Sequence, residues 1–316
     1  MKTRTDRGIP ATRGWGIALA LATALISGIS IYLNAFAVKQ VPDAAVYTTL
    51  KNGVAAIALL LLLVAAGDGR RVAVRALRPH QWGGLVLLGF IGGSLPFVLF
   101  FTGLGQASAP SAAFIHKTLF VWVALLAVPL LGERLGTWQL GGLGLLLLAQ
   151  VLVAPPTGVR WGMGETLIGG ATLLWAAEVI VAKRVLPGVP SGIAAAGRMG
   201  FGLVFLVGYL AIAGKLGGIA ALGPTAWAWI AITGSLLTAY VATWYAALQR
   251  APATVVTSVL VAGAVVTASL QAISMGSLPR PEAIGGYLLV AAAVAGLAAA
   301  SARSGHRSTA RVAVTA

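Results

Sequence analysis

The sequence predicts an all-α membrane protein: ten transmembrane helices in two inverted five-helix repeats, with the N- and C-termini in the cytoplasm. Three observations predict this fold: 59% hydrophobic against 9% charged residues, apolar runs long enough to cross a bilayer, and basic residues that gather in alternate connections. A soluble domain of 316 residues could not bury so much apolar surface. The chain has no cysteine, which excludes disulfides, zinc–thiolate sites and thiol catalysis.

The apolar runs set the positions of the expected helices. Each run has about 18 to 25 residues, enough to cross a hydrocarbon core of roughly 30 Å at about 1.5 Å per residue. The first run is too long for the apolar core of a signal peptide and further spans follow it, so we expect it to be retained. The ten predicted spans are 14–38, 44–66, 81–104, 109–131, 137–154, 162–186, 192–214, 225–248, 252–274 and 283–301.

The basic residues predict the orientation. If the N-terminus is cytoplasmic, most Lys and Arg outside the spans fall in cytoplasmic segments, and the opposite side holds only Lys39, Arg160, Lys215 and Arg280. This bias is the one that cytoplasmic connections show. The net charge of +15 therefore reflects membrane topology, and we expect a lipid bilayer and no nucleic acid as partner.

The two halves repeat short motifs in the same order. Five spans are an odd number, so the second copy must enter the membrane from the opposite side, a design typical of secondary transporters that hold a substrate near the midplane. We predict repeats at 1–156 and 157–302, followed by a basic, disordered tail at 303–316. The matching motifs are Trp15-Gly16 with Trp161-Gly162, Lys51 with Arg198, Gly93-Ser94-Leu95 with Gly234-Ser235-Leu236, Ala109-Pro110 with Ala251-Pro252, and Gly141-Gly142 with Gly285-Gly286.

One stretch resembles a known family. The pattern Leu131-Gly132-Glu133-Arg134-Leu135, followed by Gln139-Leu140-Gly141-Gly142 and an apolar run, is similar to the end of an EamA-type repeat of the drug/metabolite transporter superfamily. The resemblance covers nearly the whole chain, from about Trp15 to Ala300, but the second copy departs from it at Met275-Gly276-Ser277. The resemblance implies a multi-pass protein of the bacterial cell inner (cytoplasmic) membrane. It also implies transport of small metabolites, because members export amino acids, exchange sugar phosphates or nucleotide sugars, or expel cations.

Lys117 is the first candidate for contact with substrate. A charged Lys at mid-helix is unfavourable by roughly 2.5 to 3.5 kcal/mol on insertion scales, so we expect it to face the protein interior or a wet cavity. Its neighbour His116 points about 100° away around the helix. Alternatively, Lys117 is satisfied by a carbonyl that Pro96 leaves free in the neighbouring helix, and His116 is an interior histidine with ordinary partners.

Three other ionisable residues lie inside spans. Lys51 and Arg198 occupy matching places in the two repeats, and each could either reach a membrane surface with its long side chain or contact substrate. Glu178 is the acid deepest in a span. It could pair with Arg198 on the next helix, or it could couple transport to protons, and the sequence leaves both open.

Several polar and aromatic residues could line a pocket. Tyr240 and Trp244 lie four apart on one expected helix, and Phe97 and Phe101 match them in the other repeat. Trp175 is another deep aromatic residue, and Ser258 lies with other hydroxyl residues along one side of its span. Ordinary helix packing would use the same residue types.

The leading hypothesis is an exporter or exchanger of small carboxylate-bearing metabolites, most of all amino acids of aromatic or broad specificity, working as a monomer or homodimer. Cations outnumber anions inside the spans, which favours an anionic group on the substrate and disfavours lipophilic cations. A phosphorylated-sugar or nucleotide-sugar exchanger and a multidrug exporter are the alternatives. We expect no enzyme, cofactor or metal, because the spans contain no aspartate pair and no cluster of metal ligands.

Overall fold

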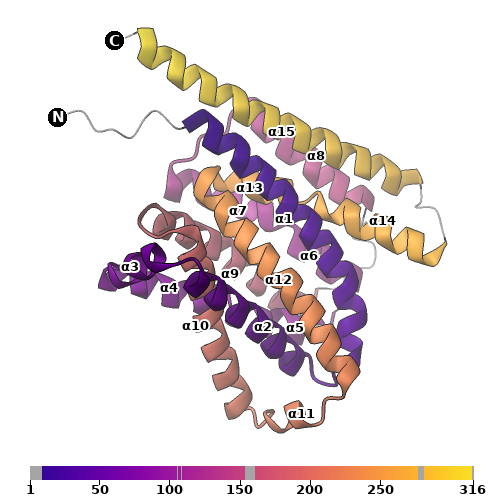
Figure 1. The fold of residues 1–316 in the computed structure, drawn as a ribbon. Helices are drawn as coiled ribbons and strands as arrows, with labels where there is room; N and C mark the ends of the chain where they lie inside the picture. The colour runs from indigo at the N-terminus through magenta and orange to yellow at the C-terminus, as the bar shows by residue number, and fades with distance from the viewer. Residues whose placement is uncertain (1–8, 105, 108, 154–160, 277–280, 315–316) are drawn as a thin grey trace.

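Helices are the regular elements of the computed structural model, which describes residues 9–104, 106–107, 109–153, 161–276 and 281–314 (Figure 1). Among these residues, eight helical segments are long and apolar enough to cross a membrane, and the apolar helices Thr137–Val153 and Pro281–Leu297 are shorter. The chain is therefore an all-α, multi-pass membrane protein, as its apolar runs predicted.

The first half comprises α1 (Ile9–Ala37), η1 (Val38–Gln40), α2 (Ala44–Ala65), α3 (Asp68–Arg75), α4 (Pro79–Ile91), α5 (Leu95–Leu104), α6 (Ala109–Lys117), α7 (Leu119–Leu131) and α8 (Thr137–Val153). The second half comprises α9 (Met163–Val185), η2 (Leu186–Gly188), α10 (Ser191–Ile212), α11 (Gly217–Ala220), α12 (Pro224–Arg250), α13 (Ala253–Leu260), α14 (Gly263–Met275) and α15 (Pro281–Val314). The short helices α3 and α11 occupy connections between spans.

The helix pairs that pack between the two halves occur in equivalent sets, in which each helix is replaced by its counterpart from the other half. α1 packs on α12 as α5 packs on α9, and α2 packs on α12 as α10 packs on α4. α2 meets its own counterpart α10, and α8 meets its counterpart α15 at one edge of the bundle (Figure 1). A twofold relation between the halves produces this pattern of contacts.

The bundle has two ends. The start of α1, the end of α15 and α3 lie on one side in Figure 1, and α11 lies on the other. We call the end with the start of α1 and the end of α12 the terminal face, and the end with α11 and the start of α2 the distal face. The start of α1 does lie close to the end of α12 on the terminal face, because a Cβ added to Gly16 would contact Arg250 and Ala251.

Three spans that we expected to be continuous helices are interrupted. The predicted span 81–104 is split into α4 and α5, span 109–131 into α6 and α7, and span 252–274 into α13 and α14. The second and third are equivalent spans of the two halves. Discontinuous helices of this kind are where transporters build their binding sites, because the freed backbone groups lie in the middle of the bundle.

The α4–α5 interruption has a local cause. Gly92 and Gly93 have low helix propensity, and Pro96 has no N–H with which to bond the carbonyl four residues earlier, that of Gly92. The interruption also lets two backbones meet, since a Cβ on Gly202 of α10 would lie 2.8 Å from the Gly93 carbonyl oxygen. α4 and α10 therefore cross in direct backbone contact.

The other two interruptions are closed by tight turns. At the α6–α7 junction the Thr118 hydroxyl donates to the Ile115 carbonyl at 2.6 Å and accepts from the Trp122 indole at 3.0 Å. At the α13–α14 junction the N–H groups of Val261 and Ala262 bond carbonyls three residues earlier. Each turn keeps its polar backbone groups paired inside the apolar bundle.

The C-terminal end differs from the expectation of a disordered tail at 303–316. In the structure α15 continues as a helix to Val314, and residues 315–316 lie outside the described part of the chain. The segment contains several Ala and Arg residues, which are strong helix formers and can extend a helix beyond its apolar portion.

We predict that Gly202→Ala destabilises the protein by about 1–3 kcal/mol, because its new Cβ must displace the Gly93 backbone. Gly200→Ala is the matched control: it lies on the same helix, and no atom lies within 4 Å of its Cβ position, so its thermal unfolding should be unchanged or slightly raised. Thermal unfolding of both variants in detergent micelles measures the difference. Equal melting temperatures of the two variants would show that α4 and α10 do not cross in direct backbone contact.

Candidate functional site

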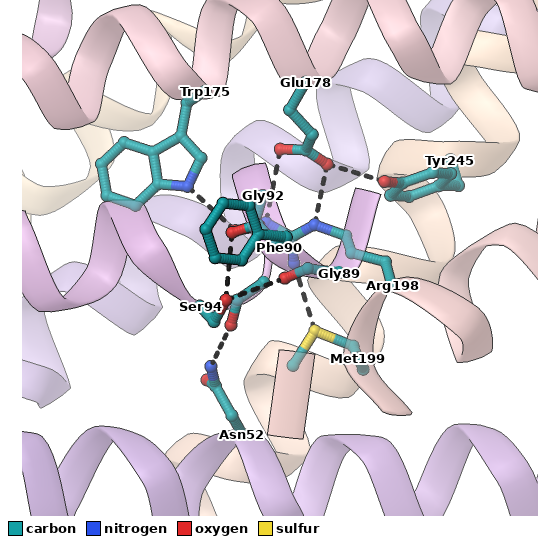
Figure 2. Close-up of polar contacts among 11 residues, drawn as sticks. Asn52, Gly89, Phe90, Gly92, Ser94, Trp175, Glu178, Arg198, Met199 and Tyr245 are labelled. Atoms are coloured by element: carbon teal, nitrogen blue, oxygen red, sulfur yellow. Dashed lines mark hydrogen bonds and ion pairs between the residues drawn. The ribbon is translucent and has the colours of Figure 1, made fainter. Parts of the chain in front are cut away.

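The centre of the bundle contains a buried polar network around the α4–α5 interruption (Figure 2). The Gly92 carbonyl, which Pro96 leaves free, accepts a hydrogen bond from the Arg198 guanidinium at 2.8 Å and another from the Trp175 indole at 3.2 Å. The Gly93 carbonyl accepts from the Asn52 side chain at 3.2 Å. Side chains from three other spans thus complete the hydrogen bonding of the interrupted helix.

Arg198 also forms an ion pair with Glu178. The Arg198 Nε lies 2.7 Å from Glu178 Oε1, and the Tyr245 hydroxyl donates to the same oxygen at 2.6 Å. Both side chains are buried, with 7% and 4% of their surface exposed. Of the two roles that the sequence left open for Glu178, the geometry shows the ion pair, and a Cβ on Gly92 would collide with its carboxyl carbon at 2.4 Å.

A cavity of ≈ 290 Å³ opens near the distal face between the two halves. α2 contributes Thr48, α5 contributes Phe97 and Phe101, and α10 contributes Leu206 and Tyr209. Thr48 is only 1% exposed and its hydroxyl has no hydrogen-bond partner among the described residues. The cavity therefore has an aromatic wall and one polar group with unused hydrogen-bonding capacity.

Lys51 lies beside this aromatic wall. Its ammonium is 6.0 and 5.9 Å from the ring centres of Phe97 and Phe101, and 5.3 Å from that of Tyr47. Its hydrogen bond goes to the Asn34 amide oxygen at 3.1 Å. Lys51 is 6% exposed, and no ion pair of the described residues includes it. A buried cation thus rests on neutral partners alone.

An ion pair between the halves lines the mouth of the cavity. Lys215, in the connection after α10, lies 2.8 Å from Asp43, which caps the start of α2. Burial acts to raise the pKa of Asp43, but hydrogen bonds from Lys215, Val46 and Ala45 and the charge of Lys215 together bring it below its ordinary value of 3.8. The hydrogen bond to Asp43 in turn raises the pKa of Lys215.

These shifts fix the pH range of the pair. Asp43 contributes to stability above its ordinary pKa and loses this contribution as the pH falls through the lower folded value. Lys215 contributes below its ordinary pKa and loses its contribution as the pH rises through the higher folded value. The pair is consequently charged and formed throughout the neutral range.

A row of aromatic rings leads from the cavity to His116. Phe97 contacts Trp175 edge-on with ring centres 5.3 Å apart, and Trp175 contacts His116 at 4.9 Å. Phe100 contacts both Trp175 and His116. The Nδ1 atom of His116 is buried without a hydrogen-bond partner among the described residues. His116 therefore packs as part of this row instead of facing the cavity.

Lys117 ends α6 at the interruption of its span. It is not among the residues that line the ≈ 290 Å³ cavity, and no described residue forms a hydrogen bond or an ion pair with it. The alternative in which a carbonyl freed by Pro96 satisfies Lys117 is not what the structure shows, because Arg198 and Trp175 occupy that carbonyl.

The remaining candidates lie apart from the cavity lining. Tyr240 and Trp244 stack with ring centres 6.0 Å apart on α12, and Trp244 is 5% exposed within the main apolar core. Ser258 is buried on α13, and its hydroxyl has no partner among the described residues. The structure brings together Lys51, Phe97 and Phe101, and it separates Tyr240, Trp244 and Ser258 from them.

Sequence reasoning missed several members of the site. Asn34 accepts the hydrogen bond of Lys51, the Tyr47 ring lies beside the Lys51 ammonium, and Thr48 lines the cavity. Tyr47 could have been found, because it lies one helical turn before Lys51 on the same face. Among the described residues no group of three or more His, Asp or Glu side chains could hold a metal ion.

We predict that Glu178→Gln destabilises the protein by about 3–5 kcal/mol, because the buried Arg198 charge loses its counter-ion. The double variant Glu178→Met/Arg198→Met should be more stable than either single charge deletion, since it leaves no unpaired charge. Asp68→Asn, at the exposed pair with Arg71, is the control and should change stability by less than about 1 kcal/mol. Thermal unfolding in detergent measures these variants, and equal effects at the two sites would contradict the burial of the pair.

Comparisons with known proteins agree with this architecture. The model of the EamA-like transporter family matches residues 14–154 and again residues 162–299. A solved structure described only as a crystal structure of a protein is similar to the chain, with a TM-score of 0.74 at 16% identity over 92% of this chain and 99% of that one. A search of curated protein sequences finds no match. Two matched domains cover most of the sequence, and so the chain belongs to the EamA-like transporter family of the drug/metabolite transporter superfamily, as a membrane transporter and not an enzyme.

Proposed function

We propose that this transporter exports or exchanges small metabolites that carry a carboxylate, in particular amino acids with an aromatic or other apolar side chain. It works by alternating access in the bacterial inner membrane, with the terminal face toward the cytoplasm. The observation that carries the proposal is Lys51, a buried ammonium beside a cavity with no carboxylate paired to it in the described structure.

The charge of Lys51 needs a counter-ion. An amide oxygen and three aromatic rings stabilise an ammonium less than a carboxylate does, and a buried unpaired cation is unfavourable within a membrane. A substrate carboxylate in the cavity would supply the missing charge. The ammonium would then be more favourable in the loaded than in the empty protein, which favours anionic and zwitterionic substrates over neutral ones.

The rest of the cavity suits an amino acid. Phe97 and Phe101 offer apolar ring surface to a side chain, and the Thr48 hydroxyl offers a hydrogen bond. A volume of ≈ 290 Å³ is near the lower end of ligand pockets, which fits a small solute and not a nucleotide.

The alternative substrates find less support. Phosphate groups are usually held by several Arg or Lys side chains, yet Arg198 is occupied by Glu178 and Lys215 at the cavity is paired with Asp43, which leaves Lys51 as the cation without a carboxylate partner beside the described cavity. A lipophilic cation would be attracted to a buried carboxylate, but Glu178 already accepts from Arg198 and Tyr245. Phosphorylated sugars and multidrug substrates therefore serve as competitors in the test.

We predict that Lys51→Met raises the half-saturation concentration for labelled amino acids about ten- to a hundredfold in proteoliposomes, because the charge-assisted contact is lost. Lys51→Arg should keep part of the activity, since it keeps the charge. Lys39→Met, which removes an exposed Lys from the connection before α2, is the control and should transport normally.

Two results would count against the proposal. Flux of amino acids that is unchanged by Lys51→Met would remove Lys51 from the site. Flux that is competed by sugar phosphates or by quaternary amines, and not by amino acids, would move the substrate to another class. Circular dichroism of each variant separates loss of binding from loss of fold.

Lys117 gives a separate prediction. If Lys117, the neighbour of His116, is a second cation for the substrate, Lys117→Met should lower saturable flux without lowering the melting temperature. Unchanged flux would remove Lys117 from the transport path. His116→Phe, which preserves the ring contacts with Trp175 and Phe100, reports whether the imidazole itself is required.

A further inference from the structure

The connection after α7 reaches from the first half of the chain to the second. Glu133 accepts hydrogen bonds from the N–H groups of Ala253 at 2.6 Å and Thr254 at 3.1 Å, and from the Thr254 hydroxyl at 2.6 Å. These donors form the start of α13, whose own N-cap residue, Pro252, provides no side-chain hydrogen bond. A carboxylate from another helix pair thus caps α13, where the helix dipole favours negative charge.

A second contact holds the same connection from the other side. The Arg184 guanidinium at the end of α9 donates to the Leu130 carbonyl at 3.0 Å. α7 itself packs against both α9 and α13. The chain crosses the bundle four times between the start of α1 and the end of α7, so the connection after α7 lies on the terminal face. These contacts therefore hold the two halves together at the terminal face.

The equivalent position in the second half carries no carboxylate in the sequence. Gly132 and Gly276 both end their helices with positive φ, +67° and +60°, which aligns the two connections. Glu133 follows Gly132, whereas Ser277 follows Gly276, so the second copy has no carboxylate there. Among the described residues α6 and α14 show no packing comparable to that of α7 and α13. The cavity beside Thr48 opens at this distal face.

We propose that Glu133 latches the terminal face shut, and that its absence from the second repeat makes the transporter rest with its cavity open to the distal face. The inference rests on the alternating access proposed above, in which the halves exchange roles. Each state would need a closure at one face. At the terminal face a carboxylate caps a helix of the other half, whereas at the described part of the distal face Asp43 caps its own helix α2 and pairs with Lys215, and both of these side chains are more than a third exposed, which makes their contact the weaker one. Glu133 is therefore a positioning residue that sets which side is open, without touching substrate.

Glu133→Ala should shift the equilibrium toward the terminal-open state by about 5- to 30-fold, the effect of losing one helix cap. Because the chain contains no cysteine, single cysteines report the opening of each face cleanly. Thr257→Cys on α13, 2% exposed, reports on the terminal side, and Thr102→Cys on the cavity wall reports on the distal side. Ala195→Cys, 0% exposed on α10, reports on general unfolding.

The reporters are labelled with a charged maleimide in detergent micelles, where both faces are accessible. With Glu133 present, Thr102→Cys should react quickly and Thr257→Cys slowly. Glu133→Ala should accelerate labelling at 257 and slow it at 102, with no change at 195. Glu282→Ala, which removes an exposed acid from the first turn of α15, should leave all three rates unchanged.

Two results would overturn the latch: unchanged rates at 257 and 102, or faster labelling at all three positions, which means general loosening. If Glu133→Ala does not fold, Thr254→Val removes only the hydroxyl donor and should shift the same two rates in the same directions. No substrate is used, so failure here would leave the proposed substrate class standing. Conversely, a lack of amino-acid flux would leave the labelling result intact.

Discussion

Within a bilayer every backbone polar group must find its partner inside the protein, and this requirement governs the interior of this transporter. The structure interrupts three of its spans, and each interruption frees carbonyls far from water. The Gly92 carbonyl is the clearest case, because Pro96 removes its normal donor and Arg198 and Trp175 replace it. Arg198 in turn requires Glu178, and Glu178 accepts from Tyr245.

This network explains why the ionisable residues inside the spans have different environments. Lys51 and Arg198 hold matching positions in the two repeats, yet their surroundings differ. Arg198 is neutralised by Glu178 and bonded to the interrupted helix, so it serves the fold. Lys51 meets only an amide oxygen and aromatic rings beside a cavity, so its charge remains available. In the proposed function the two matching positions are thus specialised, Arg198 for structure and Lys51 for a ligand.

The sequence predicted the spans well because hydrophobic length is a property of each segment by itself. The sequence indicated a carbonyl freed by Pro96 in 81–104 but not the full interruptions, since a glycine pair or a single threonine barely changes the hydrophobicity of 81–104 or 109–131. The sequence also could not show which of Lys51 and Lys117 lies beside the candidate site, because their environments depend on residues from other helices. Glu133 was recognised only as part of a family motif, and its partner lies 120 residues away in the chain.

The order in which these groups are synthesised has a consequence for membrane insertion. Gly92 leaves the ribosome long before Trp175, Glu178 and Arg198 exist. Until α9 and α10 enter the bilayer, the nascent first half must hold an unsatisfied carbonyl in lipid or stay next to the water of the insertion machinery. The first repeat would consequently mature only after the second has been translated, and a chain truncated after α8 would be a substrate for membrane quality-control proteases.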